Sequence, residues 1–231
     1  MAVILSIETA TPVCSCILSK DGKALINKES FEYQSHASMV GVFVDEIMRY
    51  ARDNGIKLDA VAVSSGPGSY TGLRIGVSEA KGLSYGLDIP MISVHTPLIM
   101  ASMVRDRVDD DTLLCPMIDA RRMEVYATFF NKSLEVIRDT SADIVDGEIY
   151  SEFLKNGKVV FFGNGSEKCK SVLTDKNAVF LESINPLASG MVQLAENAFE
   201  EGDFVDTAYF EPYYLKEFVA TVPKNKVINI K

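Results

Sequence analysis

The chain has 231 residues, enough for one large domain or two smaller ones, and its 47% hydrophobic and 24% charged residues are ordinary for a globular protein. Its formal net charge of −9 at pH 7 disfavours tight binding to nucleic acid by this chain alone, because the basic clusters "DARRMEV" and "VPKNKVINIK" are small. No apolar run approaches the roughly twenty residues of a membrane helix, and the apolar start has no basic lead, so we expect a cytoplasmic protein.

The first half of the chain shows the patterns of three strands, a helix, a strand, a helix, a strand and a further helix. Asn54 and Gly55 are typical of a helix end, and Pro97 suits the first turn of a helix. Three antiparallel strands followed by two crossover units predict an α/β fold, a mixed sheet with helices on its faces, in the order of the actin-like and ribonuclease H-like core. These segments are 2–9, 14–20, 23–33, 36–53, 60–66, a helix that ends near Gly86, 90–96 and a helix from Thr96.

A charged stretch, "RDRVDDDT" around residue 108, is the best candidate for a domain boundary. It divides a predicted N-terminal domain, 1–106, which carries the first two helices, from a smaller C-terminal domain, 107–231. The second domain begins again with strands and then shows two helical patterns. Its predicted strands are 113–119, 123–131 and 159–165, and its predicted helices are about 166–173 and 185–201.

Cysteine and histidine do not form a recognisable site. The four cysteines include no CxxC pair, so buried and reduced thiols are favoured. One of the two histidines, His36, begins the first predicted helix, where a helical metal pair would need a second histidine four residues later; Val40 stands there. His36 is therefore interpreted as a polar residue at a helix start. We predict no catalytic residue, bound metal or cofactor for this chain.

The glycine-rich stretch "SSGPGSYTGLRIG", residues 64–76, lies between a predicted strand and a predicted helix. It is not a P-loop, because Thr71 stands where the second glycine should be and no Lys-Ser/Thr pair follows. As a dinucleotide fingerprint its third glycine comes one residue late. An anion could still be held by the N–H groups of the helix start, but a strand-to-helix corner is the favoured interpretation. The predicted structural loop consists of Gly66, Pro67, Gly68 and Gly72.

The first two helices have the patterns of contact surfaces. Small residues recur every four positions along the second helix and allow another helix or the sheet to approach closely. Apolar residues cover about half the circumference of the first helix, more than one sheet needs. The surplus flank is covered either by the second domain or by another protein. The predicted interface residues are Met39, Phe43, Ile47, Met48, Tyr50, Gly72, Gly76 and Ala80.

Two further clusters are weaker candidates for a functional site. Glu8, with two threonines in "SIETAT", occupies a place similar to the phosphate-binding hairpin of actin-like kinases, but no glycine lets a phosphate approach the backbone. The charged residues of "IDARRMEVY" are typical of a turn network rather than of an active site. They are Asp119, Arg121, Arg122 and Glu124.

Five stretches, in this order, resemble the TsaB family, also called YeaZ: "ILSIETATPVCSCIL", "SHASMV", "SSGPGSYTGLRIG", "MIDARRMEVYATFF" and "EPYYLKEFVA". The resemblance implies an actin-like (ASKHA) two-domain fold and a role in making threonylcarbamoyladenosine (t6A) in tRNA. It implies a non-catalytic subunit that forms a homodimer when alone, pairs with the paralogue TsaD, and reaches TsaE and tRNA only through that pair.

The resemblance also separates this chain from TsaD. TsaD carries two metal-binding histidines at i and i+4 on a helix, and the corresponding positions here are His36 and Val40. An actin-like small-molecule kinase or hydrolase with a degenerate phosphate site is the alternative, which the absent P-loop lysine disfavours. A stand-alone protease is a third hypothesis, which the two histidines disfavour.

Overall fold

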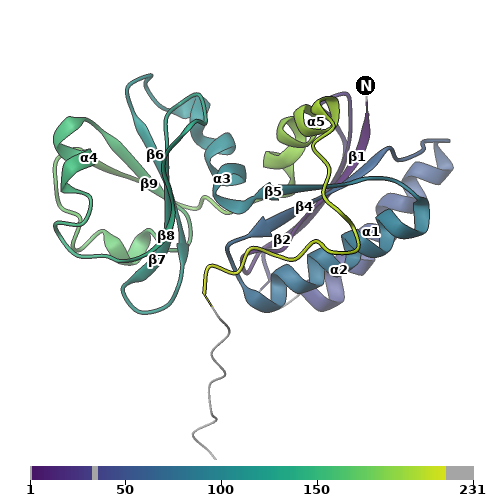
Figure 1. Cartoon of the computed structure of the whole chain (residues 1–231), viewed down its shortest axis with the longest axis horizontal. Coiled ribbons are helices and arrows are strands. Elements are labelled where there is room, and N and C mark those ends of the chain that lie inside the picture. The colour runs from purple at the N-terminus through teal and green to yellow at the C-terminus, as the bar shows by residue number, and fades with distance from the viewer. Residues whose placement is uncertain (1, 33–35, 217–231) are drawn as a thin grey trace, which may run out of the picture.

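The protein consists of two lobes side by side, each built on a five-stranded mixed sheet with helices on its faces (Figure 1). The computed structural model describes residues 2–32 and 36–216, and the side chains of His36 and Ala37 are not described. The predicted α/β class, mixed sheets covered by helices, is confirmed.

The first sheet has the strand order β3-β2-β1-β4-β5. β1 pairs antiparallel with β2 and parallel with β4, so the chain makes a meander and then two crossovers. β1 and β4 are buried along their whole length, which is why they read as apolar runs rather than alternating patterns. The strands are β1 (Val3–Glu8), β2 (Cys14–Lys20), β3 (Lys23–Ser30), β4 (Ala60–Gly66) and β5 (Met91–His95).

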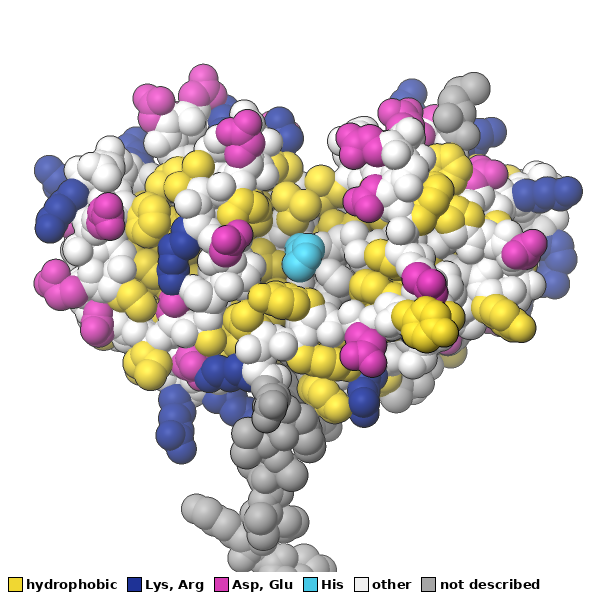
Figure 2. Space-filling model, in the orientation of Figure 1, with side chains coloured by type: hydrophobic (Ala, Val, Ile, Leu, Met, Phe, Trp, Pro, Cys, Tyr) yellow, Lys and Arg dark blue, Asp and Glu magenta, His cyan; other side chains and the backbone are white. Residues whose placement is uncertain are grey.

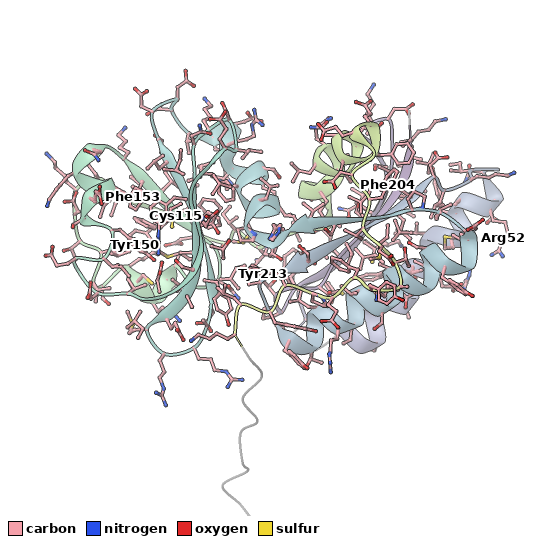
Figure 3. All side chains as sticks on the ribbon, in the orientation of Figure 1. Arg52, Cys115, Tyr150, Phe153, Phe204 and Tyr213 are labelled. Carbon is pink, nitrogen blue, oxygen red and sulfur yellow. The ribbon has the colours of Figure 1, made fainter. Side chains whose placement is uncertain are left out.

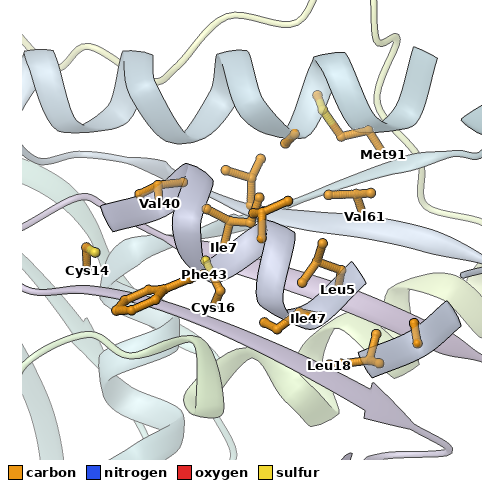
Figure 4. Packing of buried hydrophobic residues seen from close by; sticks show 14 of the residues in the cluster. Leu5, Ile7, Cys14, Cys16, Leu18, Val40, Phe43, Ile47, Val61 and Met91 are labelled. Carbon is orange, nitrogen blue, oxygen red and sulfur yellow. The ribbon is translucent and has the colours of Figure 1, made fainter. Parts of the chain in front are cut away.

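Helices α1 (His36–Asp53) and α2 (Tyr70–Leu87) cover one face of this sheet. Their inner side chains form one apolar core with alternate residues of β1 and β2, among them Ile7 and Cys16 (Figure 4). The opposite face is covered by a 3-10 turn, η3 (Ala188–Met191), and by α5 (Val192–Glu201).

The second sheet has the strand order β10-β9-β6-β7-β8. One face packs on α4 and a short 3-10 turn, η2, and its core is rich in aromatic rings such as Phe129 and Phe161. The edge strand β8 is anchored by the nearly buried carboxylate of Asp143, which accepts hydrogen bonds from Arg138 and from the Tyr150 hydroxyl at 2.8 Å. The elements are β6 (Leu113–Asp119), β7 (Glu124–Phe130), β8 (Val136–Ile144), α4 (Ser151–Asn156), β9 (Val159–Phe162), η2 (Glu167–Cys169) and β10 (Ala178–Leu181).

Helix α3 (Thr96–Val104) lies between the lobes and continues into the 3-10 turn η1 (Arg105–Arg107). The sequence "TPLIMASMV" is apolar on all sides, as expected for a helix that is covered all round. Ile99 packs into the core of the first lobe, and Met100 and Val104 pack into the core of the second. One short helix therefore contributes to both cores.

The structure differs from the sequence-based expectations mainly in the second half of the chain. The helix expected near 166–173 is only the 3-10 turn η2, and the helix expected over 185–201 is η3 followed by α5. α5, which the predicted division assigned to the second domain, packs on the first sheet. The division between residues 106 and 107 remains a prediction.

Candidate functional site

The predicted contact surface on α1 divides into buried and accessible residues. Phe43 and Ile47 are 6% and 0% exposed, so they pack in the chain's own core. Their place in the interface stays a prediction, and in this chain they pack against the first sheet. Met39, Met48 and Tyr50 are half-buried at the flanks of the same core. They remain the accessible part of the prediction.

Sequence reasoning missed the most exposed apolar residues of the two helices. Val42 on α1 is 47% exposed, and Tyr85 and Leu87 at the end of α2 are 87% and 43% exposed. Val42 follows Met39 by three positions, so the helical spacing already placed both on neighbouring parts of one surface. We call the accessible residues of α1, Met39, Val42 and Met48, together with the exposed Tyr85 and Leu87 of α2, the two-helix face.

The small-residue stripe of α2 faces inward. A Cβ atom on Gly72 would run into the backbone carbonyl oxygen of Thr9, and one on Gly76 would run into the Thr9 hydroxyl. Ala80 is fully buried in the core of the first lobe. Gly72, Gly76 and Ala80 are therefore small where α2 packs closely on its own lobe, and their place in an interface stays a prediction.

The glycine-rich stretch forms a tight corner between β4 and α2. Its cap is local, since the Ser69 hydroxyl accepts the Gly72 N–H at 3.2 Å and the Ser69 N–H donates to the Ala10 carbonyl at 2.7 Å. Gly66 has φ +102°, and a Cβ there would lie 2.8 Å from the carbonyl oxygen of Tyr213. Pro67 follows it through a cis peptide bond.

Glu8 is buried at the end of β1 and points away from solvent. One carboxylate oxygen accepts the Ala10 N–H at 2.6 Å. Burial raises the pKa of Glu8 to about 7, because desolvation penalises the charged carboxylate more than the hydrogen bonds it accepts stabilise it. The neighbouring turn residues Thr11 and Pro12 line the cleft between the lobes, whereas Glu8 does not.

The cleft between the lobes has a volume of about 980 Å³. On one side it is lined by the β1–β2 turn and the glycine-rich corner, on the other by the β6–β7 turn, and along its edge by residues 213–216. The charged turn predicted from the sequence lies here: Asp119 pairs with Lys168, and Glu124 pairs with Lys216. Arg121 and Arg122 of that turn are exposed, with φ of 73° and 47°.

Val40 stands where the resemblance implied the second histidine of a metal-binding pair, and it is an apolar, buried residue. Val40 is 1% exposed and packs in the core beneath α1, so it offers no ligand atom toward any surface. The side chain of His36 lies outside the described residues. Over residues 2–32 and 36–216 we find no cluster of three or more histidine, cysteine or acidic residues arranged to hold a metal ion. Within the same ranges, no helix combines the length and apolarity that a bilayer span requires.

Comparison with known proteins gives a consistent result. The family model described as "TsaD: tRNA N6-adenosine threonylcarbamoyltransferase" matches residues 32–226. The Escherichia coli K12 protein named "tRNA threonylcarbamoyladenosine biosynthesis protein TsaB" is 32% identical over 224 residues, covering 94% of this chain and 96% of the relative. A Haemophilus influenzae protein of the same name is 28% identical over 228 residues, covering 94% of each chain.

A solved structure agrees with these relatives. It is described as a Pseudomonas aeruginosa protein with similarity to peptidase YEAZ, and it superposes with a TM-score of 0.78 at 25% identity. The match covers 94% of this chain and all of the other. The two-lobed actin-like fold that the resemblance implied is thereby confirmed.

Proposed function

Because this chain belongs to the TsaB (YeaZ) family, we propose that it is a non-catalytic subunit of the machinery that makes t6A in tRNA. In this role it forms a homodimer when alone and pairs with TsaD in the complex. TsaE and tRNA are reached only through that pair. The chain by itself carries out no step of the reaction.

The observation that carries the proposal is the side chain found at the second metal-binding position of the corresponding TsaD helix. The second position of the i, i+4 pair is Val40, buried at 1% exposure in the core. A valine side chain has no lone pair to offer a metal, so the TsaD metal pair cannot be assembled here. The acidic residue nearest to a kinase-like phosphate hairpin, Glu8, is also buried and does not line the cleft. Both features disfavour the alternative of a small-molecule kinase or hydrolase.

The two-helix face is the surface that we propose for pairing. It carries Val42, 47% exposed, between the half-buried methionines Met39 and Met48. Methionine adapts its shape to different partners, which suits a face that binds a second copy in one state and TsaD in another. The two pairings would then exclude each other.

The test is reconstitution of t6A synthesis. TsaC, TsaD, TsaE, tRNA, threonine, bicarbonate and ATP are combined with or without this chain, and t6A is measured by mass spectrometry of digested tRNA. We expect product to depend on the chain, and the chain alone to give no product and no ATP hydrolysis above a heat-treated control. Equal t6A formation without the chain, or turnover by the chain alone, would overturn the proposal.

A further inference from the structure

The two lobes are joined on one side of the cleft by α3. Ile99 is fully buried with Ile4 and Ile92 in the core of the first lobe. Five residues further along the helix, Val104 is fully buried in the core of the second lobe. The hydroxyl of Ser102 donates to the Gly190 carbonyl at 2.7 Å, which ties the helix to the returning chain. Because α3 is buried in both cores, it is the candidate axis for relative movement of the lobes.

A second connection crosses the other side of the cleft. We call residues 205–216 the strap. It begins with the Val205 N–H donating to the Met91 carbonyl on β5 at 2.9 Å. After a turn in which the Phe210 N–H donates to the Asp206 carbonyl at 2.8 Å, it runs along α2 without regular secondary structure (Figure 1). The Lys81 ammonium of α2 donates to the Ala208 carbonyl at 3.1 Å. The strap is thus attached to the first lobe before it reaches the cleft.

At the cleft, the strap lies directly on the glycine-rich corner. The Tyr213 N–H donates to the Ser65 carbonyl at 2.7 Å, and the Tyr213 ring meets the His95 ring edge-on at 5.5 Å. The Tyr214 ring packs on Tyr70, the first residue of α2, with ring centroids 4.8 Å apart. Figure 3 places Tyr213 between the two lobes.

The last described residue of the strap reaches the second lobe. Lys216 forms an ion pair with Glu124, the first residue of β7. The Glu124 side chain is 21% exposed, so this pair is better shielded from solvent than most pairs on this protein's surface. The strap therefore binds the first lobe through Tyr213 and Tyr214 and the second lobe through Lys216.

These contacts can be released without unfolding either sheet. The hydrogen bonds from the strap to the first lobe are isolated rather than part of a ladder, and the other contacts are made by side chains. Val205 and Phe210 also pack against the core of the first lobe. The weakly connected part, which opens at lower free energy than core strands, is therefore residues 213–216. Residues 213–216 also line the cleft, so their position affects both its width and its access.

We propose that residues 205–216 act as a clasp that holds the two lobes at a fixed separation across the cleft, with α3 as the hinge on the opposite side. Release of Tyr213, Tyr214 and Lys216 allows the lobes to rotate about α3 and the cleft to open. The proposal concerns this chain's own conformation, and it stands whether or not the chain serves in t6A synthesis.

The experiment measures the separation of the lobes in the full chain. Spin labels are placed at Lys57→Cys in the first lobe and Lys176→Cys in the second, both exposed, whereas the four native cysteines are buried. The distance distribution is recorded by double electron–electron resonance for the parent chain, for Lys216→Glu, which sets two negative charges against each other, and for Tyr214→Ala. The charge-swapped variant Lys216→Glu with Glu124→Lys tests for restoration.

The control is Lys170→Glu, the same substitution at a lysine whose ion pairs with Glu167 and Glu182 both stay within the second lobe. We expect Lys216→Glu and Tyr214→Ala to broaden the distribution and shift it to longer distances, and the swap to return it to that of the parent. The control should leave it unchanged. A parent-like distribution in both variants, a swap that fails to restore it, or an equal shift in the control would overturn the clasp.

Discussion

Thr9 and Gly72 lie against each other where the β1–β2 turn meets helix α2, and the Thr9 carbonyl oxygen occupies the space that a side chain at Gly72 would need. One turn further along α2, the Thr9 hydroxyl does the same to Gly76. A single residue at the end of β1 thus fixes how closely the helix approaches the sheet. Glycines are needed at both positions because each faces Thr9 across this close contact.

Alanine at either glycine should destabilise the protein. Gly72→Ala forces the Thr9 backbone or the start of α2 to move, and Gly76→Ala forces the Thr9 side chain or the helix to move. Such overpacking costs about 1–3 kcal/mol of unfolding free energy. Gly82→Ala is the matched control on the same helix, because a Cβ there meets nothing within 4 Å. It should be neutral or stabilising by up to about 1 kcal/mol. Urea unfolding curves distinguish the cases; equal effects at Gly72 and Gly82 would contradict this packing.

Charges on the two-helix face should prevent pairing without unfolding the chain. Met39→Lys, Val42→Lys and Met48→Lys each place an ammonium in a contact where burial without a partner costs several kcal/mol. We expect at least one of them to shift the homodimer to monomer in light scattering and to weaken capture by TsaD. Melting of the monomer should change little for Val42→Lys, because Val42 is already 47% exposed, and more for Met39→Lys and Met48→Lys, because these methionines are half-buried against the core.

The control for these variants is Ile137→Lys on β8, which is 49% exposed in the other lobe and lies far from both helices along the chain. This variant should form the homodimer and capture TsaD as the parent chain does. If all three helix variants stay dimeric and still capture TsaD, the pairing surface lies elsewhere.

Glu8 should make the protein less stable as pH rises toward neutrality. Its pKa in the folded chain is raised to about 7 by burial, so the folded state keeps a proton that the unfolded chain loses near its usual value. The folded state then binds more protons than the unfolded state between the two pKa values, and unfolding free energy falls across that window. At about 1.4 kcal/mol per pKa unit, the full loss is roughly 3 kcal/mol.

Glu8→Gln removes the titration while keeping an oxygen for the Ala10 N–H. We expect this variant to be more stable than the parent at pH 8, and its stability to fall less between pH 5 and pH 8 than that of the parent. The exposed Glu152→Gln should follow the parent curve. Urea unfolding at a series of pH values is the measurement, and an unchanged slope in Glu8→Gln would show that Glu8 does not titrate in this window.

The isolated chain should bind tRNA weakly. Acidic side chains are spread over both lobes on the face shown in Figure 2, and the net charge of −9 opposes the attraction of phosphates that dominates nucleic-acid affinity. Filter binding at physiological salt should give a dissociation constant above about 1 μM. Tighter binding would mean that local attraction of tRNA phosphates, for example by the exposed Arg121 and Arg122, exceeds the repulsion from the net negative charge.

The sequence predicted most elements of the first lobe, because β1, β2 and β4 are almost wholly buried and read as apolar runs, and the helices have clear ends. Thr96 and Pro97 mark the start of α3 correctly, since proline fits the first helical turn. β8 was missed because "VIRDTSADI" is a half-exposed edge strand that owes its place to the Arg138–Asp143 pair, a contact that spacing does not reveal.

The candidate site was harder to predict than the fold. Periodicity showed that Gly72, Gly76 and Ala80 share one side of a helix, but it could not show whether that side meets the chain's own sheet or a partner. The cleft brings together segments near residues 10, 70, 120 and 215, and only tertiary structure places these side by side. The inward side of α2 follows from Thr9, and nothing in the sequence around Thr9 signals it.

Because α5 packs on the first sheet, the order in which the two lobes can fold during synthesis differs from their order in the sequence. The second lobe has all of its strands by residue 181, the end of β10, and its core is complete once Ile184 has been synthesised. The first lobe still lacks Met191 and Ala195, both fully buried over β1 and β4, so its inner sheet face stays uncovered until the chain has grown past them. During translation the later lobe can therefore finish folding before the earlier one, and the nascent first lobe is the part that needs protection from aggregation.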